Sequence, residues 1–162
     1  MTFSMSKACL PAFETGLNAL AAVLGKAEAY AAEMVKARRH ASGDDDPETK
    51  YAESDLALAY VSEGKFEAAE PLARSALDYE LKKEPDDWNR FRLESILGAS
   101  LAGQKKYAEA EGLLLSGYQG LSKRAASIGM SDHDNIDRAH KWLLQLYQDW
   151  GKPAKVAEWR KQ

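Results

Sequence analysis

The sequence predicts an all-α protein built from repeated pairs of helices. Alanine is abundant while proline and isoleucine are scarce, and this balance favours helix over strand. A pattern of apolar residues, small residues and a glycine recurs along the chain, and its spacings of three and four are those of helical faces. No segment long enough for a strand alternates polar and apolar residues with a period of two, so we expect no strands.

The repeated unit occurs three times. Its first copy begins at Leu56, its second 41 residues later at Leu97, and a shortened third copy a further 46 residues on at Leu143. The first copy reads Leu56-Ala57-x-x-Tyr60-x-x-x-Gly64-Lys65-Phe66-x-x-Ala69-Glu70, and the second aligns with it without a gap as Leu97-Gly98-x-x-Leu101-x-x-x-Lys105-Lys106-Tyr107-x-x-Ala110-Glu111.

Each unit predicts two antiparallel helices. Leu56, Ala57 and Tyr60 share one helical face, and Gly64 ends that helix because glycine readily adopts a positive φ. A second apolar stripe then runs from Phe66 to Leu77. Small residues at positions 57, 69 and 76 let the two helices approach closely.

Capping residues predict where the helices begin. Asp46-Pro47-Glu48 reads as an N-cap, a first-turn proline and an acidic first turn. Glu84-Pro85-Asp86-Asp87 serves the same purpose before the helix that holds Leu93 and Leu97. Pro71 falls inside a predicted helix, where it removes one backbone hydrogen bond and favours a kink.

The predicted organisation is a flexible N-terminus (residues 1–10) followed by one domain (residues 11–162). Within the domain we expect repeats at about 46–86 and 87–130 and a truncated repeat at 131–162. Residues 11–45 are interpreted as a degenerate first repeat, with helices over about 11–24 and 27–41 and a turn at Gly25-Lys26.

Charge and composition exclude several classes of function. The net charge is −3, with −9 over residues 44–137 between ends of +2 and +4, so no overall basic charge predicts a nucleic-acid partner. A single cysteine, Cys9, excludes an internal disulfide framework. No apolar run approaches membrane-spanning length, so we expect no membrane partner and a cytoplasmic location.

The unit resembles the tetratricopeptide repeat, whose standard form has about 34 residues. The phrases "LALAYVSEGKFEAAEPLARSALDYE" (56–80) and "LGASLAGQKKYAEAEGLLLSGYQGL" (97–121) are similar to the longer kinesin-light-chain-like subclass, with units of 41 or 42 residues. The ending "LYQDWGKPAKVAEWRK" (146–161) is similar to the C-terminal repeat tails of bacterial serine/threonine kinases. The resemblance covers about residues 46–162.

The resemblance implies a right-handed superhelical solenoid whose first helices line a concave groove for a partner peptide or helix. Carried over position by position, the groove residues are Tyr51, Ser54, Asp55, Leu58, Arg92, Ser95, Ile96, Ala99, Arg138, Lys141, Trp142 and Gln145.

The partner chemistry that these residues favour is an acidic segment. The asparagine positions of the family's two-carboxylate clamp are occupied by Asp55, Ile96 and Trp142, so that clamp is not expected. Arg92 and Arg138 would still attract acidic groups, and Trp142 is the expected hot spot.

A metal site is the first alternative. His133, Asp137 and His140 are spaced so that they share one face of a helix, and two imidazoles with a carboxylate can hold a metal ion. We favour a structural explanation, since His133 falls in a linker and His140 at a packing position.

Other reactive or charged residues have similarly simple explanations. Ser100 lacks the strand that a nucleophile turn requires, and the carboxylates at 44–46 are explained by solvation and capping. A cationic helix end explains the basic C-terminal residues near Trp150 and Trp159, which are Lys152, Lys155, Arg160 and Lys161.

The sequence therefore predicts a non-enzymatic protein-interaction module without a cofactor, whose terminal repeats offer a surface for a homodimer. One alternative is a regulatory or oligomerising tail of a larger kinase-like protein. The other is a small metal-binding protein or enzyme.

Overall fold

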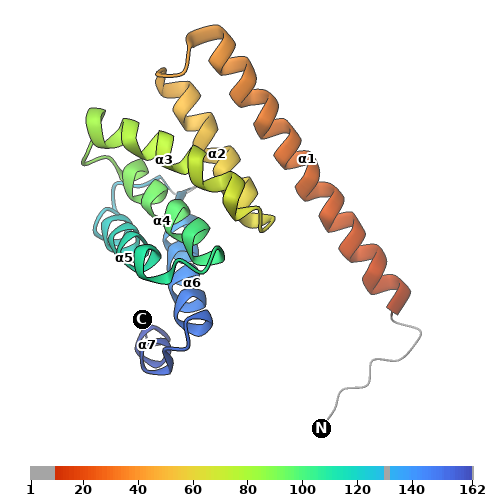
Figure 1. Cartoon of the computed structure of the whole chain (residues 1–162), viewed down its shortest axis with the longest axis vertical. Coiled ribbons are helices and arrows are strands. Elements are labelled where there is room, and N and C mark those ends of the chain that lie inside the picture. The colour runs from red at the N-terminus through yellow and green to blue at the C-terminus, as the bar shows by residue number, and fades with distance from the viewer. Residues whose placement is uncertain (1–9, 130–131, 162) are drawn as a thin grey trace.

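The computed structural model describes residues 10–129 and 132–161, and these residues form seven α-helices (Figure 1). In chain order the helices are α1 (Leu10–Ser42), α2 (Pro47–Ser62), α3 (Phe66–Lys83), α4 (Trp88–Gly103), α5 (Tyr107–Lys123), α6 (Asp134–Asp149) and α7 (Pro153–Trp159). No strand occurs among the described residues, which confirms the all-α prediction. No helix in these two ranges is both long and apolar enough to cross a membrane.

Helices α2 to α7 form three consecutive pairs, α2–α3, α4–α5 and α6–α7, each joined by a three-residue turn. The turns share one backbone geometry at the aligned positions: Gly64, Lys105 and Gly151 have φ of +74°, +64° and +70°. The next N–H then bonds back into the preceding helix, from Lys65 to the Tyr60 carbonyl (2.8 Å) and from Lys106 to the Leu101 carbonyl (2.9 Å). The third turn repeats this bond at 2.9 Å. The repeat seen in the sequence is therefore also a repeat of backbone structure.

Two of the predicted helix starts are stabilised by side-chain caps. The Asp46 carboxylate accepts from the Glu48 N–H at 3.0 Å before α2, and the Asp87 carboxylate accepts from the Asn89 N–H at 2.8 Å before α4. Pro71 lies inside α3, which continues through it to Lys83.

The prediction of two helices between residues 11 and 41 was wrong. Helix α1 is one continuous element of 33 residues that passes through Gly25 and Lys26 without a turn. A lone glycine costs a helix only about 1 kcal/mol, and Gly25 does not adopt the positive φ of the three turns. Leu10, placed in the flexible segment, is the first residue of α1, and the rest of that segment lies outside the described residues.

Helix α4 is the central element, because every residue from Phe91 to Leu101 is buried. It packs against α2, α3, α5 and α6. A helix that is covered on all sides needs close neighbours, and the close approach comes from small residues.

The small residues lie where the helices meet. In the α2–α3 pair Ala57, Ala69 and Ala76 have no exposed surface. In the α4–α5 pair a Cβ added to Gly117 would lie 2.1 Å from Ser95 Oγ and 2.7 Å from the Phe91 carbonyl oxygen. The sequence prediction that residues 57, 69 and 76 permit close packing agrees with this geometry.

Polar side chains link one pair to the next. The Glu70 carboxylate on α3 accepts from Gln104 (2.8 Å) and Lys106 (3.0 Å), both in the turn of the α4–α5 pair, and from Arg74 on its own helix. These donors, led by Gln104, lower the pKa of Glu70 to about 2. At the corresponding place one pair earlier, Lys65 in the turn pairs with Glu28 of α1.

A buried carboxylate holds α1 against the rest of the protein. Glu53 on α2 is 2% exposed and accepts from Arg39 of α1 at 2.8 Å, from Lys50 at 3.2 Å and from Ser75 of α3 at 3.0 Å. Val35, which is 4% exposed, supplies a buried apolar contact on α1. The second half of α1 thus takes the place of the second helix of a preceding pair.

We expect Gly117→Ala to lower the free energy of unfolding by about 1–3 kcal/mol, because the added methyl group meets backbone atoms of α4 that cannot easily move. Gly112→Ala is the matched control on the same helix, since a Cβ there meets nothing within 4 Å. The control should raise the free energy of unfolding by up to about 1 kcal/mol. Urea unfolding measures both, and equal effects would contradict the close packing.

We expect Glu70→Gln to remove part of the acid sensitivity of the fold. The pKa of Glu70 lies below its ordinary value of 4.5, so its stabilising effect is present above pH 4.5 and is lost as the pH falls toward 2. Because its cationic partners are half-exposed, we expect a loss of only about 1 kcal/mol at neutral pH. The difference between wild type and variant should vanish near pH 2.

Unfolding followed by circular dichroism between pH 7 and pH 2 measures this difference. Glu67→Gln, a change of an exposed glutamate on the same helix, is the control. If the free energy of unfolding of wild type exceeds that of Glu70→Gln by the same amount at every pH, the ionisation of Glu70 is not the cause of the acid sensitivity.

Candidate functional site

The first helices of the three pairs, α2, α4 and α6, form one continuous set, because α4 packs against both of the others. All twelve residues predicted to line a groove lie on these three helices. The structure separates most of them into a polar cluster and an apolar pocket. The polar cluster consists of Tyr51, Ser54, Asp55, Asn89, Arg92, Asn135 and Arg138.

Arg92 is the centre of the polar cluster. Its guanidinium donates to Ser54 Oγ at 2.5 Å, to Asp55 Oδ1 at 2.6 Å and to Asn89 Oδ1 at 3.4 Å, and it lies 5.8 Å from the centre of the Tyr51 ring. The side chain is only 8% exposed. The charge of Arg92 is therefore already compensated within the protein, and Arg92 orders α2 against α4 rather than presenting a charge to a partner.

Arg138 of α6 lies at the edge of the same cluster. Its guanidinium donates to Asn135 Oδ1 at 2.9 Å, and no described carboxylate lies within ion-pair distance of it. Burial, together with the nearby Arg92 charge, lowers the pKa of Arg138, while Asp134 acts in the opposite direction. Arg138 is thus a half-buried cation with spare hydrogen-bonding capacity.

Tyr51 lies at the α2 end of the cluster and is 43% exposed. Partial burial raises the pKa of its hydroxyl; the negative charges of Asp132, Asp55 and Asp87 act in the same direction, and Arg92 opposes them. The charges of three aspartates from three different segments therefore act on this tyrosine.

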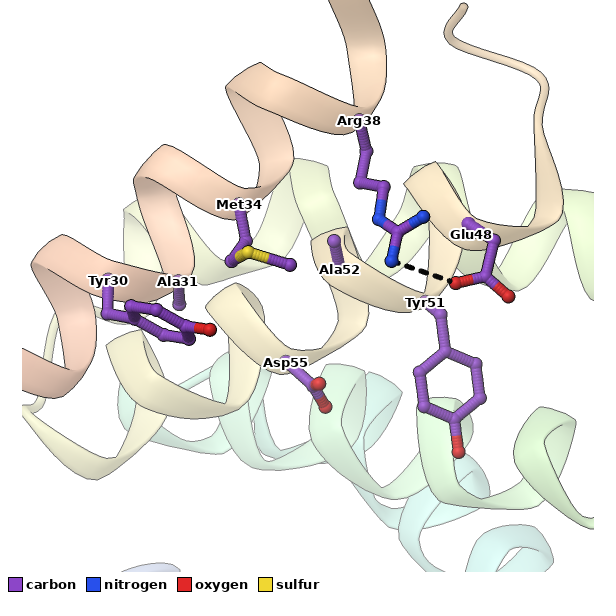
Figure 2. Close-up of a pocket in the computed structure, with 8 residues that line it drawn as sticks. All are labelled: Tyr30, Ala31, Met34, Arg38, Glu48, Tyr51, Ala52 and Asp55. Atoms are coloured by element: carbon purple, nitrogen blue, oxygen red, sulfur yellow. Dashed lines mark ion pairs between the residues drawn. The ribbon is translucent and has the colours of Figure 1, made fainter. Parts of the chain in front are cut away.

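Tyr51 also borders a pocket of about 240 Å³ between α1 and α2, which we call the α1–α2 pocket (Figure 2). An ion pair between Arg38 and Glu48, with 3.4 Å between the charged atoms, closes one end of it. Its lining residues are Tyr30, Ala31, Met34, Arg38, Glu48, Tyr51, Ala52 and Asp55.

The apolar pocket, about 200 Å³, lies toward the other ends of the first helices, and we call it the Trp142 pocket. All three first helices and the start of α3 contribute to it. Its only polar side chains are those of Gln145 and Asp149, and Gln145 donates to Asp149 at 2.8 Å. Its lining residues are Val61, Phe66, Ala99, Ala102, Gly103, Trp142, Gln145, Leu146 and Asp149.

Four predicted groove residues lie outside both places. Ile96 is 1% exposed and belongs to the core, and Ser95 is 2% exposed and donates to the Phe91 carbonyl at the contact with α5. The prediction that both line a groove was wrong, because α4 is buried on every side at their positions. Leu58 is half-buried against the core, while Lys141 is exposed on α6.

Sequence reasoning missed residues at the ends of elements. Val61 and Leu146 line the Trp142 pocket from the last turns of α2 and α6, and Phe66 lines it from the first residue of α3. Phe66 belongs to the repeat, but its place in the second apolar stripe predicts only a packing role within its own pair of helices. The sequence did not indicate that α1 residues line the α1–α2 pocket, because it predicted two helices separated at Gly25 in place of α1.

The two histidines of the alternative metal site serve separate structural roles. His133 Nε2 lies 2.9 Å from the Ala125 carbonyl oxygen just before α6, and His140 Nε2 lies 2.8 Å from the Trp159 carbonyl oxygen at the end of α7. Among the described side chains, no three or more of His, Cys, Asp and Glu are grouped to hold a metal ion.

The other candidate residues are also placed by packing and pairing. Ser100 is a buried residue of α4 that donates to the Phe66 carbonyl at 2.7 Å. Trp159 is buried in the core, and the Lys152 ammonium lies 3.2 Å from the centre of the Trp150 ring. Cys9 lies outside the described residues.

Comparison with protein-family models and with curated proteins gives no match to this chain.

Proposed function

We propose that the protein is a non-enzymatic interaction module that binds a peptide or helical segment of a partner protein on the face formed by α2, α4 and α6. The observation that carries the proposal is the Trp142 pocket, because all three first helices contribute to it. A concave, mostly apolar site with a few polar groups is the usual form of a binding site. The half-buried Trp142 supplies the large aromatic surface typical of hot spots.

The proposed fold is a right-handed superhelix of the tetratricopeptide type. The three turns of equal geometry at aligned positions support it. A cytoplasmic location accords with this proposal and with a single cysteine, which leaves no internal disulfide to be formed.

In the proposed complex, a large apolar side chain of the partner enters the Trp142 pocket, and polar groups beside it meet Gln145 and Asp149. Acidic groups of the partner would lie toward the start of α6, near Arg138 and the exposed Lys141. Arg92 takes no direct part, because its charge is compensated by Asp55. A face built on packed helices loses little conformational freedom on binding, which favours affinity.

The test uses peptides selected from a random phage-displayed library on the wild-type protein and then measured by fluorescence anisotropy. Trp142→Ala should weaken the selected peptides by about tenfold to a hundredfold, because the wall of the pocket is removed. Urea unfolding of the variant establishes that the loss is not caused by unfolding.

Leu81→Ala is the matched control, since Leu81 is a large apolar residue of α3 that is 45% exposed and does not line the Trp142 pocket. The control should bind like wild type. Selected peptides that bind Trp142→Ala as tightly as wild type would disprove this binding site.

A further inference from the structure

Helix α1 is much longer than the helix it packs against. At 1.5 Å per residue, its 33 residues extend about 50 Å, whereas the 16 residues of α2 extend about 24 Å. Glu28 of α1 already pairs with Lys65, which lies beyond the last turn of α2. The part of α1 before Glu28 therefore runs past the end of α2 and away from the helix pairs (Figure 1).

The sequence of α1 contains a heptad pattern that begins in the part of the helix that runs past α2. Apolar residues follow one another at alternating spacings of three and four for more than three heptads, which is the pattern of a coiled-coil seam. The seam residues are Leu10, Phe13, Leu17, Leu20, Leu24, Ala27, Ala31 and Met34. Val35, which is buried, and Arg39, which bonds to Glu53 of α2, fall at other heptad positions, whereas Ala31 and Met34 at the end of the seam border α2.

The seam ends in the α1–α2 pocket. Its last two residues, Ala31 and Met34, line that pocket together with Tyr51 and Ala52 of α2 (Figure 2). The next position of the seam is Arg38, whose ion pair with Glu48 marks the polar end. The C-terminal end of the seam therefore lies at the pocket between α1 and α2.

Side-chain size along the seam distinguishes the two ways in which a second copy can pair with it. The large residues are in the first half and the two alanines in the second, so a parallel pair would set alanine against alanine and leave gaps. An antiparallel pair sets Phe13 against Ala31 and Leu17 against Ala27, which combines large with small. It also keeps the two sets of helix pairs at opposite ends of the coiled coil.

We propose that two copies of this chain associate through an antiparallel coiled coil of their α1 helices, in which the seam position of Phe13 in each copy lies opposite that of Ala31 in the other. Helices in proteins gain most of their stability from tertiary packing, and a second copy supplies such packing to the part of α1 that runs past α2. The seam carries no charged residue between Leu10 and Met34, so it is self-complementary under two-fold symmetry. This association goes beyond the proposed partner binding and does not use the Trp142 pocket.

The first test is sedimentation equilibrium of the full chain. Wild type should show twice the mass of one chain, and Leu17→Lys/Leu24→Lys should weaken the dimer by about a hundredfold or more, because it buries charge at the seam. Ala22→Lys/Ala29→Lys, on the opposite side of the same helix, should leave the dimer intact. A monomeric wild type, or equal effects of the two variants, would overturn the proposal.

The second test determines the orientation by oxidative crosslinking, with Cys9→Ser as the background. A mixture of the single variants Phe13→Cys and Ala31→Cys should form a disulfide between chains, while neither variant should do so alone. Crosslinking of either variant alone, or none in the mixture, would overturn the antiparallel arrangement. Peptide capture through Trp142 is measured separately, so either proposal can fail without the other.

Discussion

The close packing of α4 against four neighbouring helices is the constraint on which the remaining structure depends. Eleven consecutive buried residues, Phe91 to Leu101, are covered only because glycine and alanine let the neighbouring backbones approach. Gly117 leaves no room for a Cβ against α4, and Ala57 and Ala76 have no exposed surface. This packing fixes the spacing of α2, α4 and α6, and with it the shape of the Trp142 pocket.

The same packing explains why charge is placed as it is. The charge of Arg92 on α4 is compensated by the Asp55 carboxylate of α2, and Ser54 accepts a further hydrogen bond, so Arg92 sets the register between two pairs. Because the Asp55 side chain is 53% exposed, this ion pair contributes more to a defined arrangement than to net stability. Glu53 has an equivalent role for α1, through Arg39. The groups available for binding a partner are therefore the Trp142 pocket and two cations of α6, Arg138 and Lys141.

The sequence predicted the pairs and their turns because these depend on local chemistry: a residue at positive φ, an N-cap and a stripe of small residues. It failed for α1, where nothing after Gly25 competes with helix continuation. It failed at Ser95 and Ile96, because the burial of α4 on all sides depends on four neighbouring helices, α2, α3, α5 and α6, and no single repeat shows this packing. A repeat pattern predicts which residues share one face of the helices, but tertiary packing decides which of these residues remain exposed.

We expect α2 to α6 to behave as one rigid unit around α4. Native-state hydrogen exchange, measured helix by helix, tests this expectation, because amide protection reports the free energy of local opening. Exchange should be slowest in α4, with α2, α3, α5 and α6 opening together with it in one cooperative step. Complete exchange of α2 and α3 while α4 and α5 stay protected would contradict it, since the first-helix face would then not be preformed.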